Sequence, residues 1–94
     1  MPTVVRGDFE WDENKAASNV AKHGITFDEA ALAMRDAFSV DFEDLVKPAN
    51  LVTLAATPDR RTLYIVTTQS SSRIRIISAR VATRHERRLY EEGE

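Results

Sequence analysis

Three closely spaced stretches rich in β-branched residues constrain the fold of this chain most strongly. They cover residues 51–56, 62–68 and 73–80, and two short polar segments separate them, the first of which contains Pro58. Proline fixes φ and polar residues favour tight turns, so each polar segment predicts a reversal of the chain. Strands joined by short turns pair antiparallel. The second half of the chain therefore predicts an antiparallel meander.

The first half of the chain carries helix boundary signals. Residues 9–11 alternate between apolar and polar side chains, as in a short strand, and lead to Asp12, a residue type that caps helices. The helix after Asp12 should run to His23, with Gly24 in the left-handed conformation that ends many helices. The apolar face of this helix is expected to consist of Ala16, Ala17, Val20 and Ala21.

Two further segments have the capping-box pattern of a hydroxyl residue followed three positions later by Glu. Residues 26–29 predict a second helix ending near Arg35, and residues 83–86 predict a C-terminal helix reaching Tyr90 or beyond. Residues 38–43 alternate in polarity and predict another strand. The expected fold is α+β, with two N-terminal helices, an antiparallel sheet of about four strands and a C-terminal helix.

Length and composition restrict the class of protein. Ninety-four residues are too few for two ordinary domains, so residues 1–94 should form one domain. The chain has no cysteine, which excludes disulfides and thiolate nucleophiles. It contains no apolar run long enough for a signal peptide or a membrane span. We therefore expect a cytoplasmic protein that does not contact membranes.

The charges are segregated along the chain, although the formal net charge is only -2. Between residues 8 and 44, ten acidic residues accompany three basic ones, whereas between residues 60 and 88 eight arginines accompany Glu86 alone. Arginine presents a planar fork suited to phosphate, and nucleic-acid binding requires concentrated positive potential. The arginine-rich segment predicts either a nucleic-acid contact or a solvated charged face.

The strand predicted over residues 73–80 interleaves arginine with apolar residues. Alternation should place Arg73 and Arg75 on one face and Arg80 on the other, in line with the isoleucine at position 74. An unpaired buried charge is costly, so Arg80 requires an acidic partner or a ligand phosphate. Arg80 is therefore expected to be either a partnered residue at the sheet edge or a catalytic cation.

Three other residues have both a structural and a functional interpretation. Glu86 stands where a capping box needs a carboxylate, and also where it can act in catalysis. Lys22 and His23 end a helix, where exposed carbonyls favour positive groups, yet histidine exchanges protons near neutral pH. We find no histidines at metal-ligand spacing, no Gly-rich phosphate loop and no Ser-His-Asp order, so neither a metal nor a cofactor is expected.

Two separated blocks of the sequence resemble the BrnT toxins. The first block consists of residues 9–12, Lys15 and residues 22–30, and the second of residues 75–80 and 83–90. The resemblance implies a RelE-like fold and an endoribonuclease that cuts RNA and stops growth. It also implies neutralisation by a BrnA-type antitoxin, which carries the DNA-binding domain, so that DNA is contacted only indirectly.

The resemblance also implies functional positions at Lys22, His23, Arg80, Glu86 and Arg87. Metal-free RNA cleavage needs a base near the 2′-hydroxyl, positive donors for the phosphate and an acid for the leaving oxygen. We assign the phosphate to Arg80 and the proton to His23 or Glu86. The predicted catalytic residues are Arg80, Glu86, His23 and Lys22. The predicted substrate-binding residues are Arg73, Arg75, Arg84 and Arg87.

The main alternative is a non-catalytic protein whose basic tail binds an acidic antitoxin segment. Its support is that BrnT toxins usually carry an arginine before the strand that begins here at Leu51, where this chain has Lys-Pro-Ala-Asn at residues 47–50. A sequence-specific DNA reader is disfavoured, because no helix-turn-helix is evident and residues 83–90 form only about two helical turns. The sequence is compatible with a homodimer and with a toxin–antitoxin heterotetramer.

Overall fold

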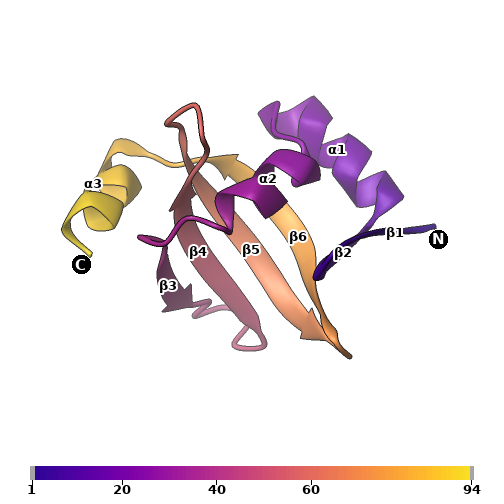
Figure 1. Cartoon of the computed structure of the whole chain (residues 1–94). Helices are drawn as coiled ribbons and strands as arrows, with labels where there is room; N and C mark the ends of the chain where they lie inside the picture. Colours follow the sequence, from indigo (N-terminus) through magenta and orange to yellow (C-terminus); the bar gives the residue numbers. More distant parts are fainter. Residues whose placement is uncertain (1, 94) are drawn as a thin grey trace.

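A computed structural model of the chain describes residues 2–93 and arranges them as one sheet with three helices (Figure 1). The order of the strands in the sheet is β1-β2-β6-β5-β4-β3. The elements are β1 (Thr3–Arg6), β2 (Phe9–Asp12), α1 (Glu13–His23), α2 (Phe27–Ala33), β3 (Val40–Glu43), β4 (Asn50–Ala56), β5 (Thr62–Ser70), β6 (Arg73–Val81) and α3 (Arg84–Glu92).

The sheet differs from the predicted antiparallel sheet of about four strands. The meander β4-β5-β6 is confirmed, but the described residues form six strands, and β2 pairs with β6 in parallel. The hairpin β1-β2 precedes α1, so the two helices are not the first elements of the chain. A parallel pair needs a long crossover connection, here the whole segment from α1 to β5, and no local pattern reveals such a pairing.

The predicted helix boundaries are largely confirmed, because caps are made by near neighbours in sequence. The Asp12 carboxylate accepts two backbone N–H groups at the start of α1, and Gly24 ends the helix with a φ of 70°. Both capping boxes, at residues 26–29 and 83–86, are formed. α2 ends at Ala33, two residues before the predicted end. No helix in residues 2–93 is long and apolar enough to span a membrane.

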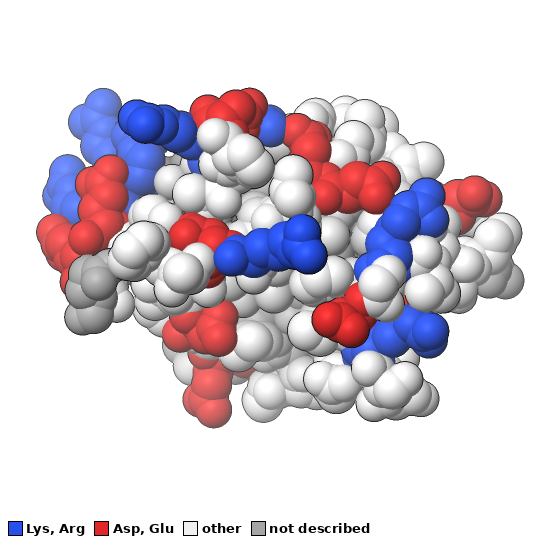
Figure 2. All heavy atoms as spheres, in the orientation of Figure 1, with Lys and Arg blue, Asp and Glu red and all other residues white. Residues whose placement is uncertain are grey.

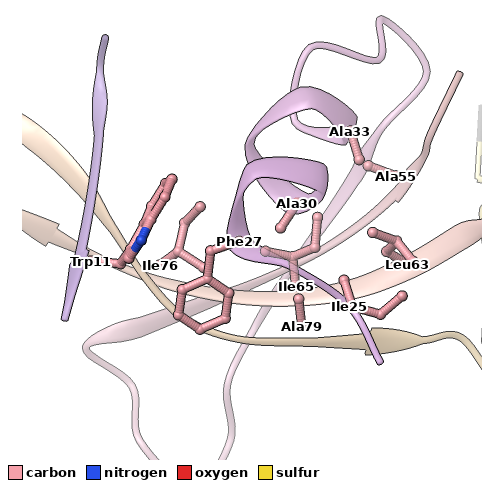
Figure 3. Packing of buried hydrophobic residues seen from close by; sticks show 10 residues of the cluster. All are labelled: Trp11, Ile25, Phe27, Ala30, Ala33, Ala55, Leu63, Ile65, Ile76 and Ala79. Atoms are coloured by element: carbon pink, nitrogen blue, oxygen red, sulfur yellow. The ribbon is translucent and has the colours of Figure 1, made fainter. Parts of the chain in front are cut away.

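The hydrophobic core lies between the sheet and the two helices α1 and α2. Trp11 of β2 meets Phe27 of α2 edge to face, with ring centroids 5.9 Å apart. Figure 3 shows side chains from α2 and the strands pointing toward one another across this layer. The core cluster consists of Trp11, Ile25, Phe27, Ala30, Ala33, Ala55, Leu63, Ile65, Ile76 and Ala79.

α3 covers part of the opposite face of the sheet. Val40, Leu54 and Tyr64 are successive neighbours across β3, β4 and β5, and Tyr64 alternates with the core residue Leu63. These three side chains therefore face away from the core. The end of α3 lies against them, since a Cβ atom at Gly93 would come within 2.7 Å of the Val40 side chain. The sheet thus has helices on both faces.

β6 contains a β-bulge at Ile77. Val66 of β5 lies opposite Ser78, whereas the next residue, Thr67, lies opposite Ile76, so Ile77 is an additional residue in β6. An additional residue inverts the alternation of side chains for the rest of the strand. The two consecutive isoleucines are the only trace of this bulge in the sequence.

The bulge changes the face on which Arg80 lies. Arg80 is opposite Tyr64, and Arg75 is opposite Thr68, four residues further along β5. Both arginines therefore point to the face that carries α3, as does Arg73, which is two residues from Arg75. The prediction that Arg80 lies on the other face from Arg73 and Arg75 is wrong, because it assumed uninterrupted alternation.

The predicted apolar face of α1 is confirmed only at Ala16, which packs against the core, whereas Ala17, Val20 and Ala21 are exposed. Val20 is 43% exposed, whereas Asn19 is only 5% exposed. The Asn19 amide donates to the carbonyl oxygens of Ile25 at 2.9 Å and Ala79 at 2.8 Å, and accepts the Ala79 N–H at 3.1 Å. Among the described residues, β6 pairs with β2 only at its residues Ile74 and Arg75, so no strand lies beside Ala79 on that side. The Asn19 amide makes the backbone hydrogen bonds there that a neighbouring strand would make.

Candidate active site

Arg80, near the end of β6, forms a two-pronged ion pair with Glu86 in the first turn of α3. The two guanidinium nitrogens lie 2.8 and 2.9 Å from the two carboxylate oxygens. The guanidinium carbon also lies 3.9 Å from the centre of the Tyr64 ring, which is cation–π distance. The side chains of Arg80 and Glu86 remain 33% and 18% exposed. The fold thus holds one cation in a fixed orientation while leaving it accessible to solvent.

Arg80 and Glu86 each stabilise the charged form of the other. The hydrogen bond from Arg80 is the main cause that lowers the pKa of Glu86; burial opposes it and the Thr83 N–H reinforces it. The hydrogen bond to Glu86 in turn raises the pKa of Arg80. One Glu86 oxygen also accepts the Thr83 N–H at 2.9 Å, in the capping box. A carboxylate engaged in this way is a weak base, and it is well suited to orienting the guanidinium.

Arg75 is engaged by β2. Its guanidinium lies 2.7 Å from a Glu10 oxygen that also accepts the Ser70 hydroxyl at 3.1 Å. The hydrogen bond from Arg75 is the main cause that lowers the pKa of Glu10. Arg73 lies nearer the β5–β6 turn, and its side chain has no ion-pair partner within residues 2–93. The fold therefore neutralises Arg75 and leaves Arg73 available.

The arginines of α3 are exposed. Arg84, Arg87 and Arg88 project from the helix surface, and none of them forms an ion pair in the part of the chain that is described. Figure 2 shows Lys and Arg side chains gathered over α3, at the upper left of the view, beside acidic ones. These cations adjoin the Arg80–Glu86 pair because Glu86 belongs to the same helix. They are free to bind an external anion.

Lys22 and His23 lie at the C-terminal end of α1, against the edge of β6. Together with Lys15 and Ser78 they line a hollow of about 220 Å³. Within residues 2–93 no hydrogen bond or ion pair joins either residue to the Arg80–Glu86 pair. Lys22 and His23 are connected to Arg80 only indirectly. Asn19, one helical turn before His23, forms hydrogen bonds with Ala79, which precedes Arg80. Figure 1 shows the end of α1 close to the end of β6.

Sequence reasoning missed three residues that organise this region. No local sequence pattern marks Tyr64 as a site residue, because its position beneath Arg80 depends on the register of β5 with β6. Glu10 becomes the partner of Arg75 only through the parallel pairing of β2 with β6. The sequence marks Asn19 only weakly, as a polar residue among the small and apolar residues of α1. All three depend on contacts between distant segments.

The sequence matches that of the toxins from type II toxin–antitoxin systems. The family model described as "Ribonuclease toxin, BrnT, of type II toxin-antitoxin system" matches residues 11–86. The matched segment includes α1, β6 and the Arg80–Glu86 pair. The chain belongs to the BrnT family, whose members act as ribonuclease toxins and have an antitoxin partner.

The structure is similar to the crystal structure of the Brucella abortus ribonuclease toxin BrnT, with a TM-score of 0.65 and 23% sequence identity. The alignment covers 79% of this chain and 94% of the Brucella chain. At this identity the likeness establishes the shared fold. No curated protein sequence matches the chain.

Proposed function

We propose that this chain is an active endoribonuclease toxin that cuts RNA without a metal ion and is neutralised by a BrnA-type antitoxin. The observation that carries the proposal is the oriented Arg80–Glu86 pair, accessible to solvent and adjacent to the unpaired cations of α3. The proposal includes a RelE-like fold, a single domain over residues 1–94, a cytoplasmic location and DNA contact only through the antitoxin. It also includes assembly either as a homodimer or, with the antitoxin, as a heterotetramer.

Arg80 is assigned to the phosphate that is cut. When the 2′-oxygen attacks phosphorus, negative charge accumulates on the non-bridging oxygens before the bond to the 5′-oxygen breaks. A preorganised cation stabilises that charge without reorganising during the reaction. Glu86 acts by holding the plane of the Arg80 guanidinium, with Tyr64 beneath it.

Proton transfer is assigned to His23 rather than to Glu86. Both oxygens of Glu86 are occupied by Arg80, and its pKa is lowered by that contact, so it accepts a proton poorly. His23 is exposed, and the hollow that it lines with Lys22 opens beside β6. Lys22 supplies a second positive charge there. Arg73, Arg84 and Arg87 are assigned to flanking phosphates, and Arg75 to a weaker contact because Glu10 already engages it.

The alternative function is antitoxin binding without catalysis. The observation that favours it is that Arg80 and Glu86 satisfy each other, as a purely structural pair does. Residues 47–50, where BrnT toxins usually carry an arginine, form the end of the loop between β3 and β4 and the first position of β4, and Lys47 is their only base.

Two experiments together test the proposal. The chain is induced in bacteria without and with the antitoxin gene from the adjacent reading frame, and the purified chain is incubated with labelled RNA in EDTA. An active toxin arrests growth only when induced alone, and it fragments RNA in EDTA. Unimpaired growth together with intact RNA favours the binding protein. Cleavage that disappears in EDTA contradicts the metal-free mechanism.

A further inference from the structure

We propose that the free edge of β3 is a docking site for an extended segment of the antitoxin in which basic and apolar residues alternate. We call residues 40–47 the β3 edge; they comprise the strand and the turn that follows it. This inference rests on the proposed neutralisation by an antitoxin. It concerns a surface separate from the Arg80–Glu86 pair.

The backbone of the β3 edge has unpaired hydrogen-bonding groups. β3 is the last strand of the sheet, and its outer side has no neighbouring strand among the described residues. The Asp44 N–H donates to the Asn50 carbonyl oxygen at 3.4 Å. In an antiparallel pair every second residue bonds to the partner strand, so Val40 and Phe42 bond to β4 as Asp44 does. The N–H and C=O groups of Asp41 and Glu43 therefore point outward. Such an edge is a template for an added strand.

The turn after β3 presents two large apolar side chains to solvent. Leu45 is 91% exposed and Val46 is 86% exposed. The turn is held in place by Asp44, whose carboxylate accepts the N–H groups of Val46 at 3.0 Å and Lys47 at 3.1 Å. Phe42 of β3 is also exposed. An apolar surface presented by a hydrogen-bonded turn and a strand edge is typical of a protein interaction site.

The side chains of β3 specify the chemistry of the added strand. Val40 and Phe42 point to the face that carries α3, and Asp41 and Glu43 point to the face that carries α2. Cross-strand neighbours share a face, so a matching strand places Lys or Arg opposite the two acids. Its intervening residues are apolar and lie beside Phe42. The required sequence therefore alternates between basic and apolar residues with a period of two.

A hollow beside the β3 edge fits the same side chains. It has a volume of about 340 Å³ and extends from Glu43 across the α2 face of the sheet, with Met34, Leu51 and Ile74 also in its lining. Lysine and arginine can bury their aliphatic stems on an apolar surface while their charged ends reach an acid. A basic residue of the added strand can therefore cover Leu51 and pair with Glu43.

The same charges disfavour a second copy of this chain as the occupant. If the β3 strands of two copies paired to form one continuous sheet, the residues on the α2 face of one copy would lie beside those on the α2 face of the other. Asp41 and Glu43 of one copy would then lie opposite the same acids of the other. Like charges directly opposite each other destabilise a strand pair. Charge complementarity thus selects a basic strand from a different protein.

The test is the affinity of the purified full-length chain for the full-length antitoxin encoded in the adjacent reading frame, measured by calorimetry. Glu43→Pro removes an outward N–H that β4 does not use, and proline is tolerated at such edge positions. Leu45→Ser with Val46→Ser removes the apolar contact from an exposed turn. Val5→Ser on β1, the opposite edge of the sheet, is the matched control, since Val5 is also exposed. Thermal unfolding verifies that each variant is folded.

Both β3-edge variants should raise the Kd at least tenfold, while the control changes it less than twofold. The Asp41 and Glu43 amides should also become protected from hydrogen exchange in the complex. Equal affinities for the wild type and both variants overturn the proposal, and so does an antitoxin that does not bind. A self-associated chain that Glu43→Pro dissociates also overturns it, because a second copy then occupies the edge. RNA cleavage is measured separately, so an inactive chain that still binds through β3 refutes only the ribonuclease proposal.

Discussion

Arg80 and the arginines of α3 belong to one basic segment, but the fold treats them differently. Arg80 is held by Glu86 and by the Tyr64 ring, whereas Arg84 and Arg87 project into solvent without ion-pair partners among the described residues. A fixed cation can stabilise charge that develops at one atom, while a mobile cation attracts phosphate with little positional demand. This difference supports the proposal that Arg80 is catalytic and that the α3 arginines attract RNA.

Removal of Arg80 should have the largest effect. We expect Arg80→Ala to lower single-turnover RNA cleavage by about 10²- to 10³-fold, the usual loss for one donor that stabilises a transition state. Arg80→Lys should retain only part of the activity, because an ammonium keeps the charge and loses the two-pronged contact with Glu86. Arg35→Ala, at an exposed arginine of the segment after α2, is the control. Wild-type cleavage by Arg80→Ala would refute the catalytic assignment.

Asn19 holds the edge of β6 next to Arg80 through its hydrogen bonds to the backbone of Ala79. In Asn19→Ala the Ala79 N–H and two carbonyl oxygens lose their buried partner, so we expect a loss of about 2 to 3 kcal/mol in the free energy of unfolding. Urea denaturation measures this quantity. Ser18→Ala, an exposed position on the same helix, should change the stability by less than about 0.5 kcal/mol. A comparably small change in Asn19→Ala would mean that the amide is not needed to complete the edge of β6.

The ion pair itself predicts a pH dependence of stability. Because Arg80 lowers the pKa of Glu86 below its ordinary value of 4.5, the ionised carboxylate stabilises the folded state. That contribution is fully present above pH 4.5 and is lost as the pH falls through the lower pKa of the folded state. Near neutral pH the free energy of unfolding of the wild type should exceed that of Glu86→Gln by about 1 to 2 kcal/mol, the usual contribution of a charge-assisted hydrogen bond.

Urea denaturation between pH 7 and pH 3 distinguishes this cause from a general effect of the substitution. The advantage of the wild type over Glu86→Gln should shrink below pH 4.5, whereas Glu91→Gln, at an exposed position of α3, should show little difference at any pH. An advantage that grows as the pH falls contradicts the assignment of the pKa to the Arg80 contact.

The features that sequence predicted well are those made by near neighbours. Asp12, Gly24 and the two capping boxes set helix ends through contacts within a few residues, and the turns of the meander are equally local. The parallel pairing of β2 with β6 joins residues 65 positions apart, such as Glu10 and Arg75, and leaves no periodic trace. The number of strands and the order of the first elements were therefore beyond local reasoning.

The candidate site shows the same division. The expectation that Arg80 needs an acidic partner or a ligand phosphate followed from the cost of an unpaired charge, and Glu86 is such an acidic partner. The face on which Arg80 lies was mispredicted, because the extra residue at Ile77 inverts the alternation. The support from Tyr64 depends on strand register, which a single sequence does not specify. The chemical roles of Lys22, His23 and the arginines stay predictions.

The smallest effect is expected at Arg87, and it tests the steering half of the comparison. If Arg87 contacts one phosphate of single-stranded RNA, Arg87→Ala should reduce the slope of log affinity against log salt by about 0.7. The affinity itself should fall only a few-fold, and thermal unfolding should not change. Fluorescence anisotropy with a 2′-O-methylated RNA, which offers no 2′-hydroxyl, measures binding without cleavage. Arg35→Ala should leave the slope unchanged. A loss of cleavage in Arg87→Ala much greater than its loss of binding would make the α3 arginine part of the catalytic group.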